Sequence, residues 1–96
     1  MTAELPMVGG LPEFNEVEIR QEVKRYKALG DETRLKMFRV LETSEHCVCE
    51  LMDIFQLNQS LVSHHVKVLE NAGLVLGQRV GKFVYYRVNH PMPKDV

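Results

Sequence analysis

The sequence predicts a mainly α-helical domain with a small β-hairpin at its end, and three observations lead to this fold class. Apolar residues recur at helical spacing between residues 16 and 73. Residues that cap or end helices interrupt this pattern at Gly30-Asp31, at Asn58 and at Ala72-Gly73. After residue 74 the pattern changes to short runs of branched and aromatic residues around a glycine. The expected order is therefore four helices followed by two strands (α-α-α-α-β-β).

Residues 1–15 are expected to form an N-terminal arm. Pro6, Gly9-Gly10 and Pro12 interrupt regular structure. Five apolar residues lie among them, too many for a purely solvated tail: Leu5, Met7, Val8, Leu11 and Phe14. We therefore expect this arm to pack on the body of the domain or on a second subunit.

The first two helices follow the arm. One is predicted to begin at Glu16 and to stop at Gly30, with Ile19, Val23 and Tyr26 on one side. Asp31 is the expected N-cap of the next helix, which ends at Thr43-Ser44. The second helix is predicted to lie almost entirely in the core through Leu35, Met37, Phe38, Val40 and Leu41.

Two further helices are expected on either side of a tight turn at Leu57-Asn58, with Asn58 as the N-cap of the second. The first of them covers residues 48–56, and its inward residues are predicted to be Val48, Leu51, Ile54 and Phe55. Two short helices joined by so tight a turn are typical of a helix-turn-helix motif.

The helix after Asn58 divides into two faces at about 100° per residue. Its apolar half contains Leu61, Val62, His65, Val66, Leu69 and Gly73. Its polar half contains Gln59, Ser60, Ser63, His64, Lys67 and Asn71. This polar half carries no carboxylate, with Glu70 placed at its border, whereas an ordinary solvated face mixes both signs of charge. A face that lies against phosphates and base edges excludes acids, so we interpret this helix as a DNA-recognition helix.

Each polar residue of that helix has an expected role. Gln59, Ser60, Ser63 and His64 are predicted to reach base edges or phosphates, and Lys67 a phosphate. His65 is predicted to point inward as a structural histidine. The alternative, a polar exterior without function, is disfavoured by the missing acids and by the hairpin that follows.

The hairpin is predicted from Leu74–Leu76 and Phe83–Val88, with its tip at residues 80–82. Arg79 and Lys82 flank this tip. A hairpin that follows a recognition helix and carries cations at its tip is called a wing, and wings contact the sugar-phosphate backbone or an adjacent minor groove. Residues 16–88 thus form the expected winged-helix domain, and residues 89–96 a C-terminal tail.

Composition narrows the class of protein. The 96 residues fit one domain, and their net charge of −1 hides an uneven distribution, because residues 58–88 hold one acid and four bases. No apolar run is long enough to span a membrane, and no secretory signal opens the chain. Two cysteines two residues apart indicate thiols in the reducing cytosol. No glycine-rich phosphate loop, paired carboxylates or nucleophile elbow is present, so we expect no enzyme.

Four segments together resemble the ArsR/SmtB family of winged-helix transcriptional repressors. They are residues 27–35, 57–69, 73–75 and 81–87, and the resemblance covers residues 26–88. The chain departs from the family pattern at Glu32, where proline is common, and at His64, where arginine is frequent. The resemblance implies a homodimer that binds an inverted-repeat operator in double-stranded DNA and releases it when an effector binds.

The segment His46-Cys47-Val48-Cys49 resembles the thiolate ligands of relatives that sense arsenic, antimony, cadmium or lead. Residues two apart on a helix point about 200° from each other. Both sulfurs can reach one ion only if Cys47 lies outside the helix or if its first turn unwinds. Thiolates at a helix N-terminus also tend to have a depressed pKa. The resemblance thus implies that Cys47 and Cys49 are the metal ligands.

The site is incomplete by the family pattern, because Met52 stands where arsenic sensors have a third cysteine. His46, an exogenous thiol or the Met52 thioether could complete it, and the thioether would favour Cu(I). No cofactor is required, and the candidate inducers are As(III), Sb(III), Cd(II), Pb(II) and Cu(I). The open alternative is a metal-independent or thiol-redox-responsive regulator. In the metal-independent case Cys49 is a small buried hydrophobic residue and Cys47 has no role, whereas in the redox case the thiols are oxidised.

Two further alternatives are weaker. The C-terminal helix that binds zinc or nickel in other relatives is not predicted here, and His90 alone does not replace it. The dimer must then be held mostly by the first helix and the arm. A winged helix that serves protein–protein contact would expose a hydrophobic face over residues 59–71, and the sequence predicts a polar one.

Overall fold

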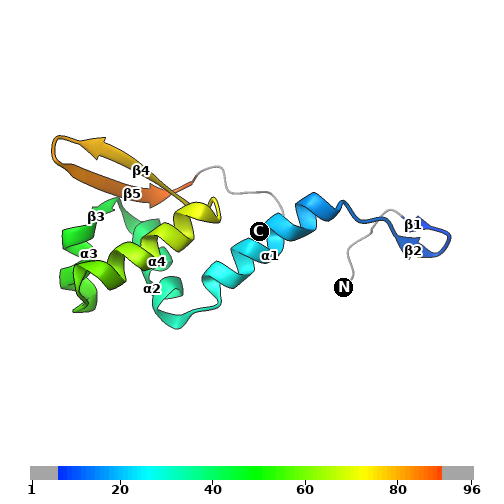
Figure 1. Cartoon of the computed structure of the whole chain (residues 1–96), viewed down its shortest axis with the longest axis horizontal. Coiled ribbons are helices and arrows are strands. Elements are labelled where there is room, and N and C mark those ends of the chain that lie inside the picture. The colour runs from blue at the N-terminus through cyan, green and yellow to red at the C-terminus, as the bar shows by residue number, and fades with distance from the viewer. Residues whose placement is uncertain (1–6, 90–96) are drawn as a thin grey trace.

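The computed structural model describes residues 7–89 and confirms the predicted order of four helices and a hairpin (Figure 1). The helices are α1 (Glu16–Leu29), α2 (Glu32–Thr43), α3 (Val48–Phe55) and α4 (Gln59–Asn71). The wing consists of β4 (Val75–Val80) and β5 (Phe83–Val88), an antiparallel pair. The expectations for residues 1–6 and 90–96, including His90, lie outside the described residues.

Two short strand pairings were not predicted. β1 (Met7–Val8) and β2 (Leu11–Pro12) form a small hairpin in the arm, around Gly9 and Gly10 with φ of 57° and 88°. Both central residues of such a tight turn need positive φ, so the two glycines make a turn where the sequence predicted only interrupted structure. β3 (His46–Cys47) pairs with β5, which gives a second sheet in the order β3-β5-β4.

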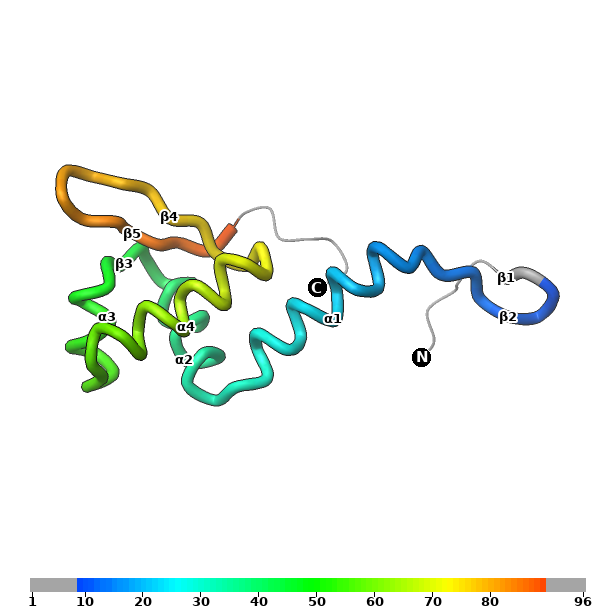
Figure 2. Tube along the Cα trace, in the orientation of Figure 1, coloured from blue at the N-terminus to red at the C-terminus, as the bar shows by residue number. Residues whose placement is uncertain are grey.

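The core lies where α2, α3 and α4 meet the wing, and the tube view shows these elements gathered at one end of the molecule (Figure 2). Its buried residues are Ala28, Met37, Phe38, Leu41, Leu51, Val62, Val66, Leu69, Leu74, Val75 and Val88. Among the described residues, no helix has the length and apolar character that crossing a membrane requires.

Three apolar residues predicted to face inward are not buried. Ile54 is 49% exposed, Leu61 44% and Leu35 38%. α3 has only eight residues and packs through Leu51 and Phe55, so Ile54 falls on its flank. The periodic pattern marks an apolar half of a helix, but each helix contacts the core through a narrower stripe.

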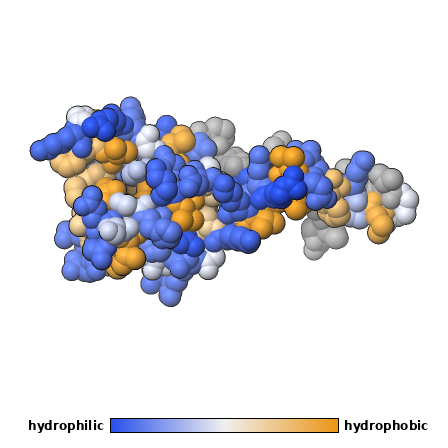
Figure 3. All heavy atoms as spheres, in the orientation of Figure 1, coloured by the Kyte–Doolittle hydropathy of each residue, from blue (hydrophilic) through white to orange (hydrophobic). Residues whose placement is uncertain are grey.

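α1 and the arm extend away from this core, and the molecule measures 55 × 25 × 23 Å (Figure 1). Leu11 and Phe14 are 70% and 57% exposed, so the arm does not bury them on the body. On α1, Val23 and Tyr26, which the sequence places on one side of the helix, are also exposed. Figure 3 shows hydrophobic side chains at the surface along this extension.

Candidate DNA-binding surface and cysteine site

The turn between α3 and α4 fixes the direction of the candidate recognition helix. Gln56 has a left-handed conformation (φ 55°), and the Leu57 N–H donates to the Met52 carbonyl at 3.2 Å. As predicted, Asn58 caps α4: its side-chain oxygen accepts a hydrogen bond from the Leu61 N–H at 2.9 Å. Gly73, at φ 79°, ends the helix in the left-handed conformation that favours glycine.

Burial of one stripe of α4 sets its rotation. Val62, Val66 and Leu69 are at most 1% exposed, and they anchor the helix against the core. The polar half therefore faces solvent. Gln59, Ser60, His64 and Lys67 are exposed there, and Ser63 is half-buried.

This polar half is not free of acid, which corrects the expectation drawn from the sequence. The Lys67 ammonium donates a hydrogen bond to the Glu70 carboxylate at 3.1 Å. The hydrogen bond and the charge of Glu70 raise the pKa of Lys67. Lys67, which is predicted to contact a phosphate, is thus already paired with an acid of its own helix.

His65 points into the domain, as predicted. Its Nδ1 lies 3.3 Å from the Arg34 guanidinium, whose Nε donates to the Ala28 carbonyl at 2.7 Å. Burial lowers the pKa of His65, and Asp31 opposes this shift only in part. Arg34 therefore connects the end of α1, the start of α2 and the inward side of α4.

The wing places two cations near its tip. The turn is tighter than predicted, because Val80 pairs with Phe83 and only Gly81 (φ 63°) and Lys82 lie between the strands. Arg79 and Lys82 are both exposed, and the Lys82 ammonium lies 5.7 Å from the centre of the Phe83 ring. β4 also begins at Val75 and extends four residues beyond the predicted strand.

The two cysteines adopt the first of the geometries expected for a shared ligand. Cys47 lies outside α3 as its N-cap residue, with extended φ and ψ of −87° and 168°. The two Sγ atoms are 3.0 Å apart, with Cys47 buried at 4% exposure and Cys49 exposed. Unwinding of the helix is therefore not needed to bring the sulfurs together.

The expected depression of the thiol pKa at this helix N-terminus is wrong for Cys49. Its pKa is raised, first by the hydrogen bond with Cys47 and then by partial burial. The hydrogen bond between the sulfurs stabilises the neutral form of the Cys49 thiol. This arrangement opposes the effect of the helix dipole.

The cysteine pair opens into a cleft of about 520 Å³ that also reaches the DNA-binding elements. Gln59 of α4 lines this cleft, as do Lys82 and Phe83 of the wing. β3 reinforces the connection, since Cys47 is paired with Tyr85 of β5. The cysteines therefore lie between the recognition helix and the wing.

The remaining candidate ligands differ in position. Met52 lines the same cleft as the cysteines. His46 instead directs its Nδ1 to the Ser44 carbonyl, 2.9 Å away. Within residues 7–89, no three His, Cys, Asp or Glu side chains are grouped closely enough to hold a metal ion.

Sequence reasoning missed two polar residues that support these sites. One Glu50 carboxylate oxygen accepts a hydrogen bond from the Cys47 N–H at 3.0 Å, which holds the start of α3. The spacing of three residues after an N-cap could have indicated this contact. Arg34 had no comparable signal, because its side-chain partner His65 lies 31 residues away in the sequence.

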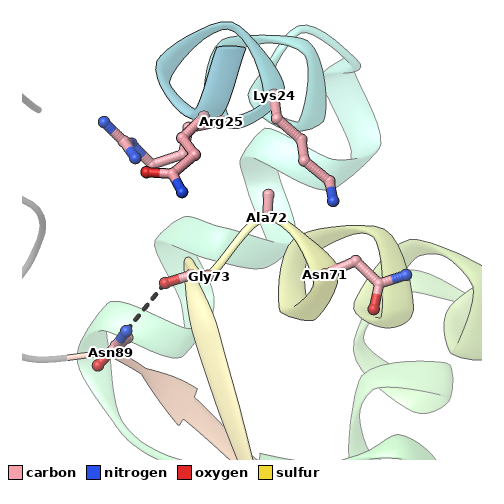
Figure 4. A pocket seen from close by; sticks show the side chains of 7 residues that line it. Lys24, Arg25, Asn71, Ala72, Gly73 and Asn89 are labelled. Atoms are coloured by element: carbon pink, nitrogen blue, oxygen red, sulfur yellow. Dashed lines mark hydrogen bonds between the residues drawn. The ribbon is translucent and has the colours of Figure 1, made fainter. Parts of the chain in front are cut away.

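A second hollow, of about 370 Å³, lies between α1 and the C-terminal end of α4 (Figure 4). Lys24 and Arg25 of α1 line it, and the Asn89 side-chain amide donates to the Gly73 carbonyl at 3.0 Å. The last turn of α4 has no basic residue of its own. The two α1 cations place positive charge near the negative end of the α4 dipole.

The fold defines the class: a winged helix-turn-helix domain, the architecture of DNA-binding transcriptional regulators. The homodimeric winged helix-turn-helix DNA-binding domain of a possible ArsR-family regulator from Mycobacterium bovis superimposes with a TM-score of 0.75. It is 26% identical and is matched over 84% of this chain and 75% of that one.

Sequence comparison specifies the family. Residues 31–76 match the model of the bacterial regulatory proteins of the arsR family. The arsenical resistance operon repressor of Bacillus subtilis is 36% identical over 74% of this chain and 69% of its own length. A homologue of the cadmium resistance regulator CadC from Staphylococcus aureus is 39% identical over 76% and 61%. The chain thus spans about two-thirds of these relatives, and it belongs to the arsR family.

Proposed function

We propose that this chain acts as a homodimeric repressor, which a soft metal or metalloid at Cys47 and Cys49 releases from an inverted-repeat operator. The observation that carries the proposal is the 3.0 Å approach of the two sulfurs in a cleft shared with Gln59 and Lys82. A ligand bound there contacts both DNA-binding elements. The arsenical and cadmium resistance regulators among its relatives support this class of inducer.

In the proposed complex, each α4 enters a major groove. Gln59, Ser60, Ser63 and His64 contact base edges or phosphates, and Lys67 contacts a phosphate. Arg79 and Lys82 of the wing contact the neighbouring backbone. The exposure of this set along α4 and the hairpin supports the assignment.

The proposed dimer surface is the apolar side of α1 with the arm. Ile19 and Val23 line a shallow hollow of about 320 Å³, and Leu11, Phe14 and Tyr26 are exposed on the same extension. A monomer seldom exposes so many large apolar groups on one element. The homodimeric neighbour from M. bovis supports a second copy as the partner. Two copies would also double the cations offered to DNA.

The sulfur donors at the cleft suit a soft ion, but they do not make up a complete site of three thiolates. Two thiols and the Met52 thioether border the cleft, a combination suited to Cu(I), and an exogenous thiol would supply the third sulfur that As(III) or Sb(III) needs. A bound soft ion supplies strong bonds to thiolate sulfur. Cys47 is anchored to β5 while Cys49 belongs to α3, so a change in their separation moves the wing relative to the helix-turn-helix.

DNA binding is tested first, by selecting duplexes from a random library with wild-type protein. We expect an inverted repeat. Arg79→Ala should weaken binding to every duplex and lower the salt dependence by about one unit per protomer, because one phosphate loses its cation. Lys67→Ala should have this effect on the selected duplex. Gln59→Ala and Ser63→Ala should instead change the preferred sequence. Equal effects of all four on selected and random DNA would contradict the assigned roles.

The inducer is tested by titrating reduced protein, bound to its selected duplex, with arsenite, Cd(II) and Cu(I). We expect thiolate charge-transfer absorbance and a fall in fluorescence anisotropy at the same metal concentration. Cys47→Ser and Cys49→Ser should retain DNA binding and abolish both signals. Met52→Leu, which preserves the shape of the side chain, should affect only the Cu(I) response. A double serine variant that still releases DNA normally would exclude this site.

Thiol oxidation is the second candidate, favoured by the same sulfur contact. Two thiols can lose two protons and two electrons to a hydroperoxide, which gives a disulfide, an alcohol and water. The sulfurs are already adjacent, and Cys49 is accessible. Release of DNA by tert-butyl hydroperoxide under metal-free conditions, reversed by dithiothreitol, would favour oxidation over metal sensing.

A further inference from the structure

The acid at the end of the recognition helix has no role in the function proposed so far. Glu70 follows Ser63 by seven residues and Gln59 by eleven, so both lie within about 20° of it around the axis of α4. It is also the only acidic residue between residues 58 and 88, which contain four bases. A carboxylate on this stripe faces the phosphates of any DNA that α4 approaches.

Helix stability does not explain the position of Glu70. It lies in the last turn of α4, at the negative end of the helix dipole, where an acid is unfavourable. Its pair with Lys67 has the lysine before the acid, which is the less favourable order along a helix. A residue that breaks two local preferences on a binding surface points to a role in binding.

The structure shows what Glu70 does in the DNA-free protein. Its carboxylate is 3.1 Å from the Lys67 ammonium, and its side chain is 32% exposed while that of Lys67 is 63% exposed. Binding to unrelated DNA depends almost entirely on cations that neutralise phosphates. An internally paired Lys67 contributes little to that binding.

We propose that Glu70 determines specificity by holding Lys67 until base contacts bring α4 close enough for a phosphate to replace the carboxylate. This inference rests on the proposed contacts of α4 with DNA. On unrelated DNA, α4 stays farther from the backbone, Lys67 keeps its partner, and the carboxylate repels the phosphates. On the operator, base contacts drive the exchange.

The test compares Glu70→Gln with wild type on two probes: the duplex selected by wild-type protein and poly(dI-dC). Glutamine keeps the size and helix propensity of glutamate. At about 50 mM salt we expect affinity for poly(dI-dC) to rise roughly three- to tenfold, and affinity for the selected duplex to rise less than about twofold. The salt dependence on poly(dI-dC) should steepen by about 0.9 per protomer.

The chain contains a matched control in α2. Arg39 and Glu42 form an ion pair with the same three-residue spacing and the same 3.1 Å distance, on a helix that is not proposed to contact DNA. Glu42→Gln therefore makes the same change in net charge and removes an equivalent pair. We expect Glu42→Gln to leave both affinities within about 1.5-fold of wild type, because α2 makes none of the proposed DNA contacts and only a screened effect of net charge remains.

A double variant tests whether Glu70 acts through Lys67. The variant with both Lys67→Gln and Glu70→Gln has the wild-type net charge. When Lys67 is already glutamine, Glu70→Gln should raise the affinity for poly(dI-dC) much less than it does in wild-type protein. An undiminished effect, an equal rise in affinity for both probes, or equal behaviour of Glu70→Gln and Glu42→Gln would each overturn the inference. If wild-type protein binds neither probe, the proposed function itself fails.

Discussion

Helices α1 and α4 have nearly the same length, with 14 and 13 residues, and both carry apolar residues at helical spacing, but their surroundings differ. α4 buries Val62, Val66 and Leu69 completely in the core. α1 buries only Arg25 and Ala28 and leaves Val23 43% exposed. The difference shows that an apolar stripe predicts burial against another surface. The stripe does not indicate whether that surface belongs to the same chain or to a partner.

The largest expected difference between buried and exposed positions lies within α4 itself. Leu69→Ala removes a fully buried side chain and should lower the free energy of unfolding by about 2–5 kcal/mol. Leu61→Ala makes the same change at a position that is 44% exposed and should cost less than about 1 kcal/mol. Urea unfolding followed by circular dichroism measures both. Equal losses of stability would contradict the division of α4 into a buried and an open apolar side.

The next prediction concerns the stripe of α1, which we propose is covered by a second subunit. Val23→Asp should raise the dissociation constant of the dimer about tenfold or more, because a buried unpaired carboxylate is costly at an interface. Val80→Asp is the matched control, since Val80 is 53% exposed on the wing. Sedimentation velocity over a range of concentrations measures both. Unchanged association of the Val23 variant would remove α1 from the dimer interface.

The difference between α1 and α4 also explains which parts of the fold were predictable. Asp31, Asn58 and Gly73 mark helix ends through local chemistry, and the structure confirms each of them. The exposure of Ile54 and Val23 was not predictable, since periodicity carries no information on the width of a contact or the identity of a partner. Strands of two residues, such as β3, have no sequence pattern at all.

In the candidate sites, too, the features set by local chemistry were predictable and those set by the tertiary fold were not. The exposed positions of Gln59, Ser60 and Lys67 follow from helix geometry, which is local. The pair of Lys67 with Glu70 was missed, because the acid was assigned to the border of the polar half, although the projection places it between Gln59 and Ser63 and its spacing from Lys67 permits a contact. Contact of the cysteines with the wing depends on β3 and the tertiary fold, so a ligand pair could be predicted from the sequence but its position could not.

The starts of the two helices offer a smaller test of the comparison. Asn58 and Asn15 are both N-caps whose side chains accept backbone hydrogen bonds at 2.9 and 3.0 Å. Asn58→Ala should lower the free energy of unfolding by about 1 kcal/mol, because the first turn of α4 carries the buried Val62. Asn15→Ala should cost only about a few tenths, since the exposed first turn of α1 can fray without loss of packing. Urea unfolding distinguishes the two, and equal costs would show that the first turn of α1 is held as firmly as that of α4.

The smallest expected effect is a pH dependence that arises from the inward side of α4. Burial lowers the pKa of His65 from its ordinary 6.5 in the folded chain, so the unfolded chain takes up a proton first as the pH falls. The folded state therefore loses stability below about pH 6.5, and the loss levels off once the folded chain is protonated as well. Protonation also ends the ability of Nδ1 to accept a hydrogen bond from Arg34, at 3.3 Å. We therefore expect wild-type protein to lose unfolding free energy between about pH 7.5 and 5.5, and His65→Gln should remove the part of this loss that comes from His65. His64→Gln, on the exposed side of the same turn, should lose as much unfolding free energy as wild type. An unaltered pH dependence in the His65 variant would show that a group other than His65 titrates in this range.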